Sequence, residues 1–303
     1  MKTNQVNQTL TNFASGIAQD TASALARFIC PIVPTGVTNG QYKKFSDKNA
    51  FQLHDTSRAL GGPRKRIEFN AEDPTFNCKP QALEIPIDDH ERDGAGDMQS
   101  RMEEAKIRTL VIAANLSHEK KVFDLIRAGK AATAGLGEWS NAAKDPIAEL
   151  DSEIEAIATE TGMMPNRFVL GLGAWRVLKN HPKVLSRQPG SSNQGVTLEQ
   201  LAGMLLNPAI EIRIGVLSRD TAKFGTGKTA TNIVGAESFI FYGSDAADVY
   251  DPSFAKCFTT TPSLVNSVRQ YRDEKAASDV HYLDWSEDIQ VVSPICGRRI
   301  TLS

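Results

Sequence analysis

One stretch of the sequence, from about Asp97 to Ala128, constrains the fold more than any other. Its apolar residues recur with a period of 3.6, which predicts a helix with a single apolar stripe. We expect the stripe to consist of Ile107, Leu110, Val111, Ala114, His118, Val122, Leu125 and Ile126. Ser100 followed by Glu103 fits a capping box, and Gly129 is a suitable stop. A helix of about 30 residues is about 45 Å long, which predicts a spine across a flat molecule.

The remainder of the sequence alternates shorter helices and strands. Asp145-Pro146 predicts the start of a second helix, which Gly162 ends. We then expect a strand at 167–170, a helix that stops at His181-Pro182, and a helix capped by Thr197 with Gln200. Further strands are expected at 210–217, 239–242, 263–271, 279–285, 288–294 and 297–303. The sum is an α+β chain whose late strands return to an early element.

Composition and charge exclude several classes of protein. Of the 303 residues, 41% are hydrophobic and 23% are charged, which is ordinary for a globular protein. No apolar run approaches the roughly 20 residues that span a bilayer, and the sequence MKTNQVNQTLTNFASG lacks the apolar core of a secretory signal. The net charge of −2 shows no basic excess of the kind found in nucleic-acid-binding proteins. We therefore expect no membrane partner and only weak binding to DNA.

The cysteines and histidines do not suggest a catalytic or metal site. The four cysteines are scattered and lack a CxxC pair, which favours reduced thiols in a cytoplasm: Cys30, Cys78, Cys257 and Cys296. The five histidines show no HxxxH, HxH or HExxH spacing. We expect His118, on the long helix, to be a satisfied boundary residue rather than a ligand. We therefore predict no catalytic, cofactor-binding or metal-binding residues, and a protein that is not an enzyme.

The segment AKFGTGKT, at residues 222–229, matches the permissive P-loop pattern with Ala222 in place of the first glycine. A P-loop needs a strand running directly into it and a helix starting at its lysine, so that helix amides face the phosphates. Here SRDT intervenes, and the following TATNIVGAESFIFYG is rich in β-branched and aromatic residues, which form helices poorly. We therefore predict a solvated loop. A P-loop NTPase is the alternative from another functional class, and a nucleotide hydrolysis assay distinguishes the two.

Two oppositely charged segments stand out on this nearly neutral chain. Residues 41–66 carry seven basic side chains against two acidic ones, and residues 88–104 carry seven acidic against two basic ones, giving net charges of +5 and −5. The basic residues are Lys43, Lys44, Lys48, Arg58, Arg64, Lys65 and Arg66. The acidic residues that open the second segment are Asp88, Asp89, Glu91, Asp93 and Asp97.

Residues 41–70 have the pattern of a long hairpin that turns at Gly61-Gly62-Pro63. A ribbon with so few apolar residues is not stable alone and must lie on another surface. The acidic run lacks the register of a calcium loop, so a solvated face is the simpler interpretation of it. Taken together, the two segments predict that the basic hairpin docks onto the acidic segment of a neighbouring subunit.

The order of these features matches a known family. A polar arm, then PIVPTG and GQYKKF, the basic hairpin, the spine helix and the terminal strands follow one another. The middle reads GEWSNAAKDPIAELDSEIEAI, TGMMPNRFVLG, LKNHPKV and TLEQLAGML. In this order the chain resembles the tailed-bacteriophage major capsid proteins of the Hong Kong 97-type fold, over roughly residues 30–300. It departs from them in the loop SRDTAKFGTGKTATN.

The resemblance implies a domain organisation. Residues 1–40 would form the N-terminal arm and 41–70 the extended β-hairpin loop. Residues 71–130 and 264–303 would form the peripheral domain with its spine helix, and 131–263 the axial domain.

The resemblance also implies a function. Subunits would form hexamers and pentamers that close into an icosahedral phage head around double-stranded DNA, assembled in the bacterial host cytoplasm and located in the virion. Expected partners are the portal, a scaffold and possible cement proteins, with no cofactor. An encapsulin-type bacterial compartment is the alternative within the same fold.

Overall fold

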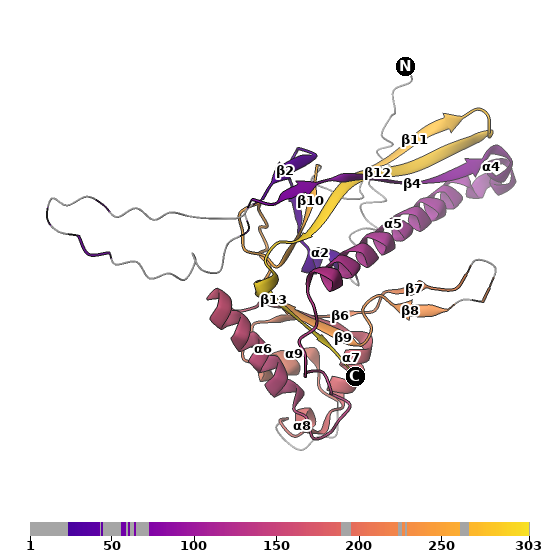
Figure 1. Cartoon of the computed structure of the whole chain (residues 1–303). Helices are drawn as coiled ribbons and strands as arrows, with labels where there is room; N and C mark the ends of the chain where they lie inside the picture. The colour runs from indigo at the N-terminus through magenta and orange to yellow at the C-terminus, as the bar shows by residue number, and fades with distance from the viewer. Residues whose placement is uncertain are drawn as a thin grey trace.

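The computed structural model of the chain has two lobes (Figure 1), and one of its hydrophobic clusters extends into both of them. The structure describes residues 24–42, 44, 56–58, 60, 64, 73–188, 195–223, 226–227, 229–260 and 267–302. Most of the predicted arm and extended loop lies outside these residues, including Lys43, Lys48, Lys65 and Arg66. The described ends of that loop meet, because β2 (Asn39–Gln41) pairs antiparallel with β3 (Thr75–Asn77).

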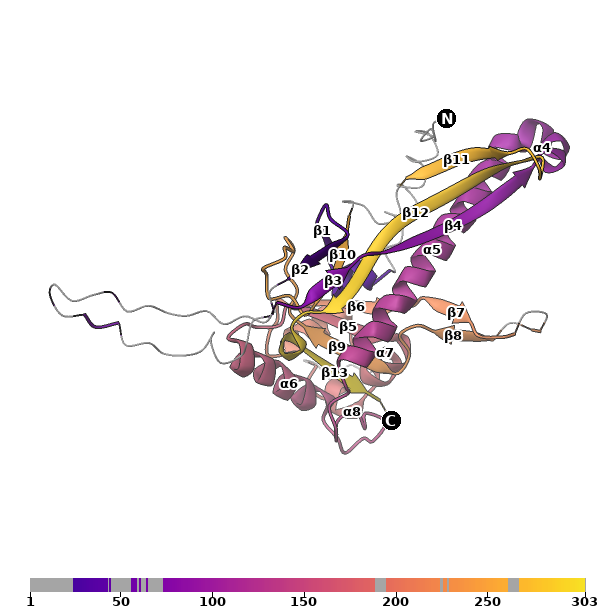
Figure 2. The ribbon, with the colours of Figure 1, turned by 45° about the horizontal axis from the view of Figure 1, so that its top comes forward.

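The predicted spine helix is confirmed: α5 (Gln99–Gly129) crosses the molecule as one rod of 31 residues (Figures 1 and 2). Its buried side chains are Ile107, Leu110, Val111, Ala114, His118, Glu119, Val122, Phe123 and Ile126. The predicted stripe is therefore correct except at Leu125, which is 44% exposed. Because successive helical residues turn by about 100°, the buried face continues through Phe123 and Ile126 and leaves Leu125 on the outer side.

α5 begins close to the predicted Asp97, but the predicted capping box of Ser100 with Glu103 is wrong. Ser100 lies inside the helix, and the N-cap residue makes no side-chain hydrogen bond. The 3-10 turn η1 (Gly96–Met98) leads directly into α5, and the amide of Gln99 donates to the carbonyl of Gly96, so no serine cap is needed. Gly129 is the last helical residue rather than the residue after the helix. A Cβ at this position would lie 2.7 Å from Val291 Cγ2.

The first lobe is a five-stranded sheet with α5 on one face. The sheet runs in the order β1 (Ile32–Pro34), β10 (Ala255–Thr259), β12 (Ser278–Val291) and β11 (Val268–Asp273), and β4 (Lys79–Asp88) also pairs with β12. The long β12 pairs antiparallel with all three of β10, β11 and β4. The late strands thus return to an early element, as predicted. The expected break between strands at 279–285 and 288–294 is wrong, because Ser286 and Glu287 continue the ladder.

The second lobe is a four-stranded sheet in the order β13 (Gly297–Thr301), β9 (Glu237–Phe241), β5 (Arg167–Gly171) and β6 (Glu211–Gly215). Every residue of β5 and β9 is buried. The helices of this lobe (Figure 1) are α6 (Pro146–Thr161), α7 (Leu172–Lys179), α8 (Pro182–Leu185) and α9 (Leu198–Met204).

The predicted helix ends are confirmed in this lobe. Asp145 Oδ1 accepts a hydrogen bond from the amide of Ala148 at the start of α6, and Gly162 ends the helix in the left-handed conformation. Thr197 and Gln200 form the expected capping box of α9. Trp139 is fully buried and donates its Nε1–H to Glu149 at 2.9 Å. These local signals therefore position the whole helical layer.

Two strands pair with the sheet of the other lobe from the one that their predicted range implies. β10 comes from the range expected to be axial but joins the five-stranded sheet, and β13 comes from the range expected to be peripheral but joins the four-stranded sheet. A separate antiparallel ribbon, β7 (Ser218–Asp220) with β8 (Ala230–Asn232), projects from the second lobe (Figure 1). Within the described ranges, none of the helices combines the length and the apolar character needed to cross a membrane.

Candidate functional site

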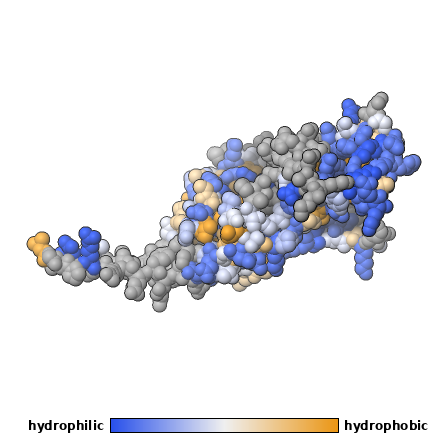
Figure 3. All heavy atoms as spheres, turned by 90° about the horizontal axis from the view of Figure 1, so that it is seen from above, coloured by the Kyte–Doolittle hydropathy of each residue, from blue (hydrophilic) through white to orange (hydrophobic). Residues whose placement is uncertain are grey.

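The predicted acidic segment lies at the far end of the first lobe, where β4 ends and α5 begins (Figure 2). It forms the short helix α4 (Asp89–Ala95), which was not predicted from the sequence. Asp88 is its N-cap: its Oδ1 accepts from the amide of His90 at 2.8 Å, and Glu91 completes a capping box. This end of the molecule is predominantly hydrophilic on the face shown in Figure 3.

Two of the five acidic side chains that open this segment form ion pairs within the subunit. Asp89 forms an ion pair with Arg272 of β11, and Glu91 with Lys106 of α5. Hydrogen bonds from these two cations lower the pKa of both carboxyl groups below their ordinary values. The acidic segment therefore presents less uncompensated negative charge than its sequence suggests.

Arg92 of the same segment contributes to this pairing from α4. Its guanidinium lies 2.5 Å from Asp279 of β12 and 3.6 Å from Glu103 of α5. Asp93 is exposed and has no ion-pair partner among the described residues. Asp97 lies in η1, and its side chain is outside the described part of the chain.

The basic residues of the predicted hairpin are only partly described. Lys44, Arg58 and Arg64 lie within the described residues, and the other four lie outside them. Arg58 and Arg64 are exposed. Within the described part of the chain, Asp89 and Glu91 pair with residues of β11 and α5 rather than with these three. Among the described residues, the ion pairs of Asp89 and Glu91 thus belong to β11 and α5 of the same subunit.

The P-loop-like segment connects β7 to β8. A strand, Ala230–Asn232, follows Thr229 where a P-loop would require a helix. Asp220 Oδ1 accepts hydrogen bonds from the amides of Ala222 and Thr229, both at 2.9 Å, and so links the two ends of the turn. The described residues of this segment form a hairpin turn, as expected for a solvated loop.

A buried polar cluster joins α5 to the five-stranded sheet. His118 is only 4% exposed, and its Nδ1 lies 2.7 Å from Glu287 Oε2 of β12. The ammonium of Lys121 lies 3.0 Å from the other oxygen of Glu287. Burial raises the pKa of Glu287, but the hydrogen bonds and charges of these two partners outweigh it and hold the pKa below its ordinary value. His118 is therefore satisfied at Nδ1, as expected, although it is buried and not at a boundary.

Glu119, next to His118, holds the first described helix in place. Its carboxylate accepts from the amides of Leu25 and Ala26 at 3.0 and 2.7 Å, at the start of α2 (Ala26–Ile29). On the other side, Arg167 of β5 donates to the carbonyl of Phe28 at 2.8 Å. The segment around α2 thus connects the two lobes. Sequence analysis missed Glu119, because a charged residue on the apolar stripe carries no local signal of a backbone partner.

Comparisons with known proteins identify relatives of this chain. No protein-family model matches the chain. The major capsid protein of Burkholderia phage BcepMu is 29% identical over 261 residues, which cover 82% of this chain and 81% of that protein. The major capsid protein of Pseudomonas phage JBD67 is 23% identical over 184 residues, covering 59% of this chain and 58% of that one.

The chain is a homologue of these two phage major capsid proteins.

Several solved structures share the fold of this chain. A phage-related protein from Bordetella bronchiseptica superposes with a TM-score of 0.76 at 24% identity, over 99% of this chain and 98% of that one. The capsid protein of Myoviridae phage XM1 gives a TM-score of 0.51 at 14% identity, over 90% of each chain. An encapsulin from Synechococcus elongatus gives 0.55, at 10% identity over 99% and 91%. Structure alone therefore fits both shell types, and the sequence relatives favour the phage capsid over the encapsulin alternative.

Proposed function

We propose that this chain is the shell subunit of a phage head, which forms hexamers and pentamers and closes into an icosahedral shell around double-stranded DNA. The observation that carries the proposal is the likeness to the BcepMu major capsid protein over most of both chains. The subunit then assembles in the bacterial host cytoplasm and ends in the virion. Portal, scaffold and possible cement proteins are its partners there. Sedimentation of the purified chain tests this: fast-sedimenting particles are expected, and a monomer that never assembles would contradict it.

The two lobes suggest the roles of the domains. We assign the lobe of α5 and the five-stranded sheet to the peripheral domain, with β10 added to the predicted ranges. We assign the four-stranded sheet and its helices, with β13 added, to the axial domain around the capsomer axes. Residues 41–70 remain assigned to the extended loop. Paired β2 and β3 support this, because the chain leaves and rejoins the molecule at neighbouring strands.

We further propose that the basic hairpin docks onto the acidic segment of a neighbouring subunit. The net charges of +5 and −5 support the idea. Because Asp89 and Glu91 are neutralised internally, Asp93 is the described carboxylate that we expect to receive the hairpin. Exposed ion pairs are individually weak and are screened by salt, so the contact depends on its repetition around each capsomer.

Charge reversal tests this docking. Changing Arg64, Lys65 and Arg66 together to glutamate should impair assembly, and high salt should weaken immature shells. Asp93→Lys in the same chain should partly restore assembly, whereas Asp89→Lys should not, because it also breaks the pair with Arg272. Normal assembly of the triple variant would rule the contact out.

A non-enzymatic role without cofactors completes the proposal. The hairpin turn between β7 and β8 supports it, since the P-loop-like segment leads into a strand. Lys228→Ala should leave particle yield unchanged, and an ATPase activity that disappears in this variant would contradict the proposal.

Free subunits should bind DNA weakly at physiological salt, because a net charge of −2 offers little phosphate neutralisation. Tight binding with a steep salt dependence would contradict this second expectation.

A further inference from the structure

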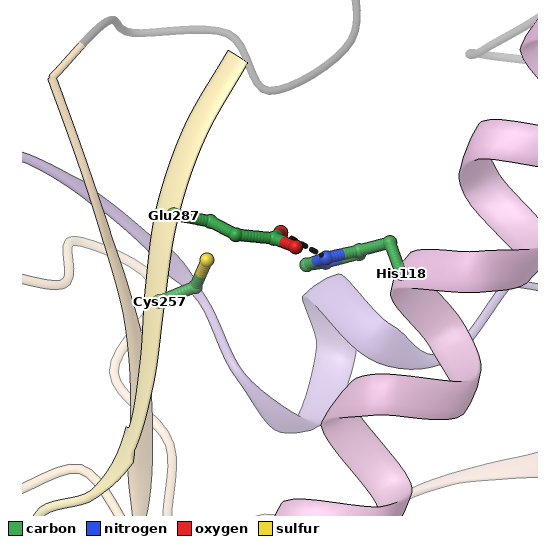
Figure 4. Close-up of side chains that lie close together, drawn as sticks. All are labelled: His118, Cys257 and Glu287. Carbon is green, nitrogen blue, oxygen red and sulfur yellow. Dashed lines mark hydrogen bonds and ion pairs between the residues drawn. The ribbon is translucent and has the colours of Figure 1, made fainter. Parts of the chain in front are cut away.

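Three buried side chains with metal-binding atoms converge where α5 crosses the five-stranded sheet (Figure 4). They are His118 of α5, Cys257 of β10 and Glu287 of β12, and they are 4%, 0% and 5% exposed. One ligand atom from each lies within 4.8 Å of the others. In Figure 4 the carboxylate of Glu287 points at the imidazole of His118, and the sulfur of Cys257 lies beside them.

We propose that His118, Cys257 and Glu287 form a binding site for a borderline-soft divalent cation of the zinc type. Such an ion takes nitrogen, sulfur and oxygen ligands at about 2.0–2.3 Å, so its ligand atoms lie about 3–4 Å apart. The pair of His118 Nδ1 and Glu287 Oε2, now 2.7 Å apart, has only to separate slightly. Water takes the fourth tetrahedral position.

Charge balance supports a divalent ion at this place. A buried charge is costly unless it is neutralised locally. One thiolate and one carboxylate together neutralise a divalent cation, and the imidazole of His118 binds it as a neutral ligand. The site as a whole then carries no net charge.

Two polar atoms of the cluster lack a partner among the described residues. His118 Nε2 is buried and makes no hydrogen bond. The thiol of Cys257 is fully buried, and no hydrogen bond to it is found either. Burial, together with the nearby Cys30 and Glu287, raises the pKa of Cys257 well above its ordinary value. A coordinated metal reverses this effect, because it binds the thiolate and releases the proton.

Lys121 is the competitor for the same carboxylate. Its ammonium lies 3.0 Å from Glu287 Oε1 and 2.6 Å from Gln81 Oε1, and its side chain is 37% exposed. It can therefore leave Glu287 for solvent when an ion binds. In the absence of an ion, Lys121 pairs with Glu287, and His118 Nδ1 lies 2.7 Å from its other oxygen. Removing the ammonium should make the site bind a cation more tightly.

An ion at this site would connect three elements that are distant in sequence. It would tie the middle of α5 to β10 and β12, beside the point where Glu119 holds the start of α2. Metal binding would therefore stabilise the junction of the spine helix with its sheet. The inference does not depend on shell assembly, since all three ligands belong to one subunit.

Cobalt(II) titration of the purified full-length chain tests the site, because cobalt takes the same ligands as zinc and its bond to a thiolate absorbs in the near ultraviolet. We expect one saturable equivalent with the thiolate band, displaced by zinc. Cys257→Ser should lose the band, and the matched control Cys296→Ser, another buried cysteine, should keep it. A wild-type chain without a saturable thiolate band would overturn the proposal, and so would a band that survives in Cys257→Ser.

The variant Lys121→Gln keeps all three ligands and guards against a loss of signal through misfolding. We expect it to bind cobalt about ten-fold more tightly than the wild type, comparable to other changes around metal ligands. Misfolding would not strengthen binding. An unchanged or weaker affinity in this variant would contradict the competition between Lys121 and the ion for Glu287, and with it this geometry of the site.

Discussion

Gly137 lies where the chain that leaves α5 passes β13. Its φ of +95° is in the region that favours glycine, and a Cβ would lie 2.2 Å from the carbonyl oxygen of Thr301. Gly135, two residues earlier, also has a positive φ of +80° but has open space around it. The pair separates two reasons for a glycine: backbone conformation at both positions, and close packing at Gly137 alone.

Alanine substitutions should reflect this difference. Gly135→Ala should lower the free energy of unfolding by about 1–2 kcal/mol, the usual cost of a left-handed L-residue. Gly137→Ala should cost a further 1–3 kcal/mol, about the usual penalty for forcing extra volume into a packed site. Urea denaturation of the two variants measures the difference. Equal effects would show that the contact with Thr301 does not limit this position.

His281 is a second residue with a measurable consequence. It is 3% exposed on β12, and neither ring nitrogen has a partner among the described residues. Burial lowers its pKa, the carboxylates of Glu103 and Asp279 partly oppose the shift, and Arg92 adds to it. His281 is therefore neutral in the folded chain, whereas the unfolded chain binds a proton below about pH 6.5.

The sign of the pH dependence follows from this shift. Below about pH 6.5 the unfolded chain binds a proton at His281, whereas the folded chain does so only at a lower pH. The free energy of unfolding therefore decreases as the pH falls from about 6.5 to the lowered pKa of the folded state. His281→Leu removes the titrating group, and its free energy of unfolding should fall less between pH 7 and pH 5 than that of the wild type. Urea denaturation at both pH values tests this. An identical fall in both proteins would show that His281 does not contribute.

At the scale of the elements, the ends of a helix or strand were predictable where a capping or terminating residue lies next to them in the sequence. α6 was predicted from end to end, because Asp145 and Gly162 act on their own helix. The capping box predicted for α5 was wrong, because the turn η1 leads directly into the helix, and the preceding helix α4 was not predicted although Asp88 and Glu91 cap it. β12 was divided in two because Glu287 interrupts the apolar pattern. It is buried through His118, 169 positions away in the sequence.

The junction between α5 and the four-stranded sheet gives a prediction at this scale. Glu237 of β9 is 6% exposed and accepts hydrogen bonds from Arg127 Nε at 2.9 Å and Arg299 Nε at 3.1 Å. Glu237→Gln would remove the carboxylate that pairs with Arg299 and would leave Arg127 with the exposed Asp124 alone, and it should cost about 3 kcal/mol of stability.

The exposed pair between Arg213 and Glu211 offers the matched control. Glu211→Gln should change the free energy of unfolding by less than about 1 kcal/mol. Calorimetric melting of both variants compares the two. A Glu237→Gln variant as stable as the control would mean that this junction does not hold the lobes together.

At the scale of the whole molecule, the α+β class and the order of elements were predictable, because the spine helix and the motifs around it lie in continuous sequence. The exchange of β10 and β13 between the lobes was not, because strand pairing joins distant segments. The acidic segment was visible in the composition, but its neutralisation by Arg272 and Lys106 was not. The sequence shows the charges of two segments but not whether the segments of two copies meet, so the docking of the basic hairpin stays a prediction.

The central claim is that this chain builds a closed shell. Negative-stain electron microscopy of the purified chain tests it most directly, with the variant in which Arg64, Lys65 and Arg66 are glutamate imaged beside it. We expect closed, uniform shells from the wild type, and fewer or incomplete shells from the variant. A wild-type chain that yields only small discrete particles, under conditions in which it is folded and concentrated, would contradict the account.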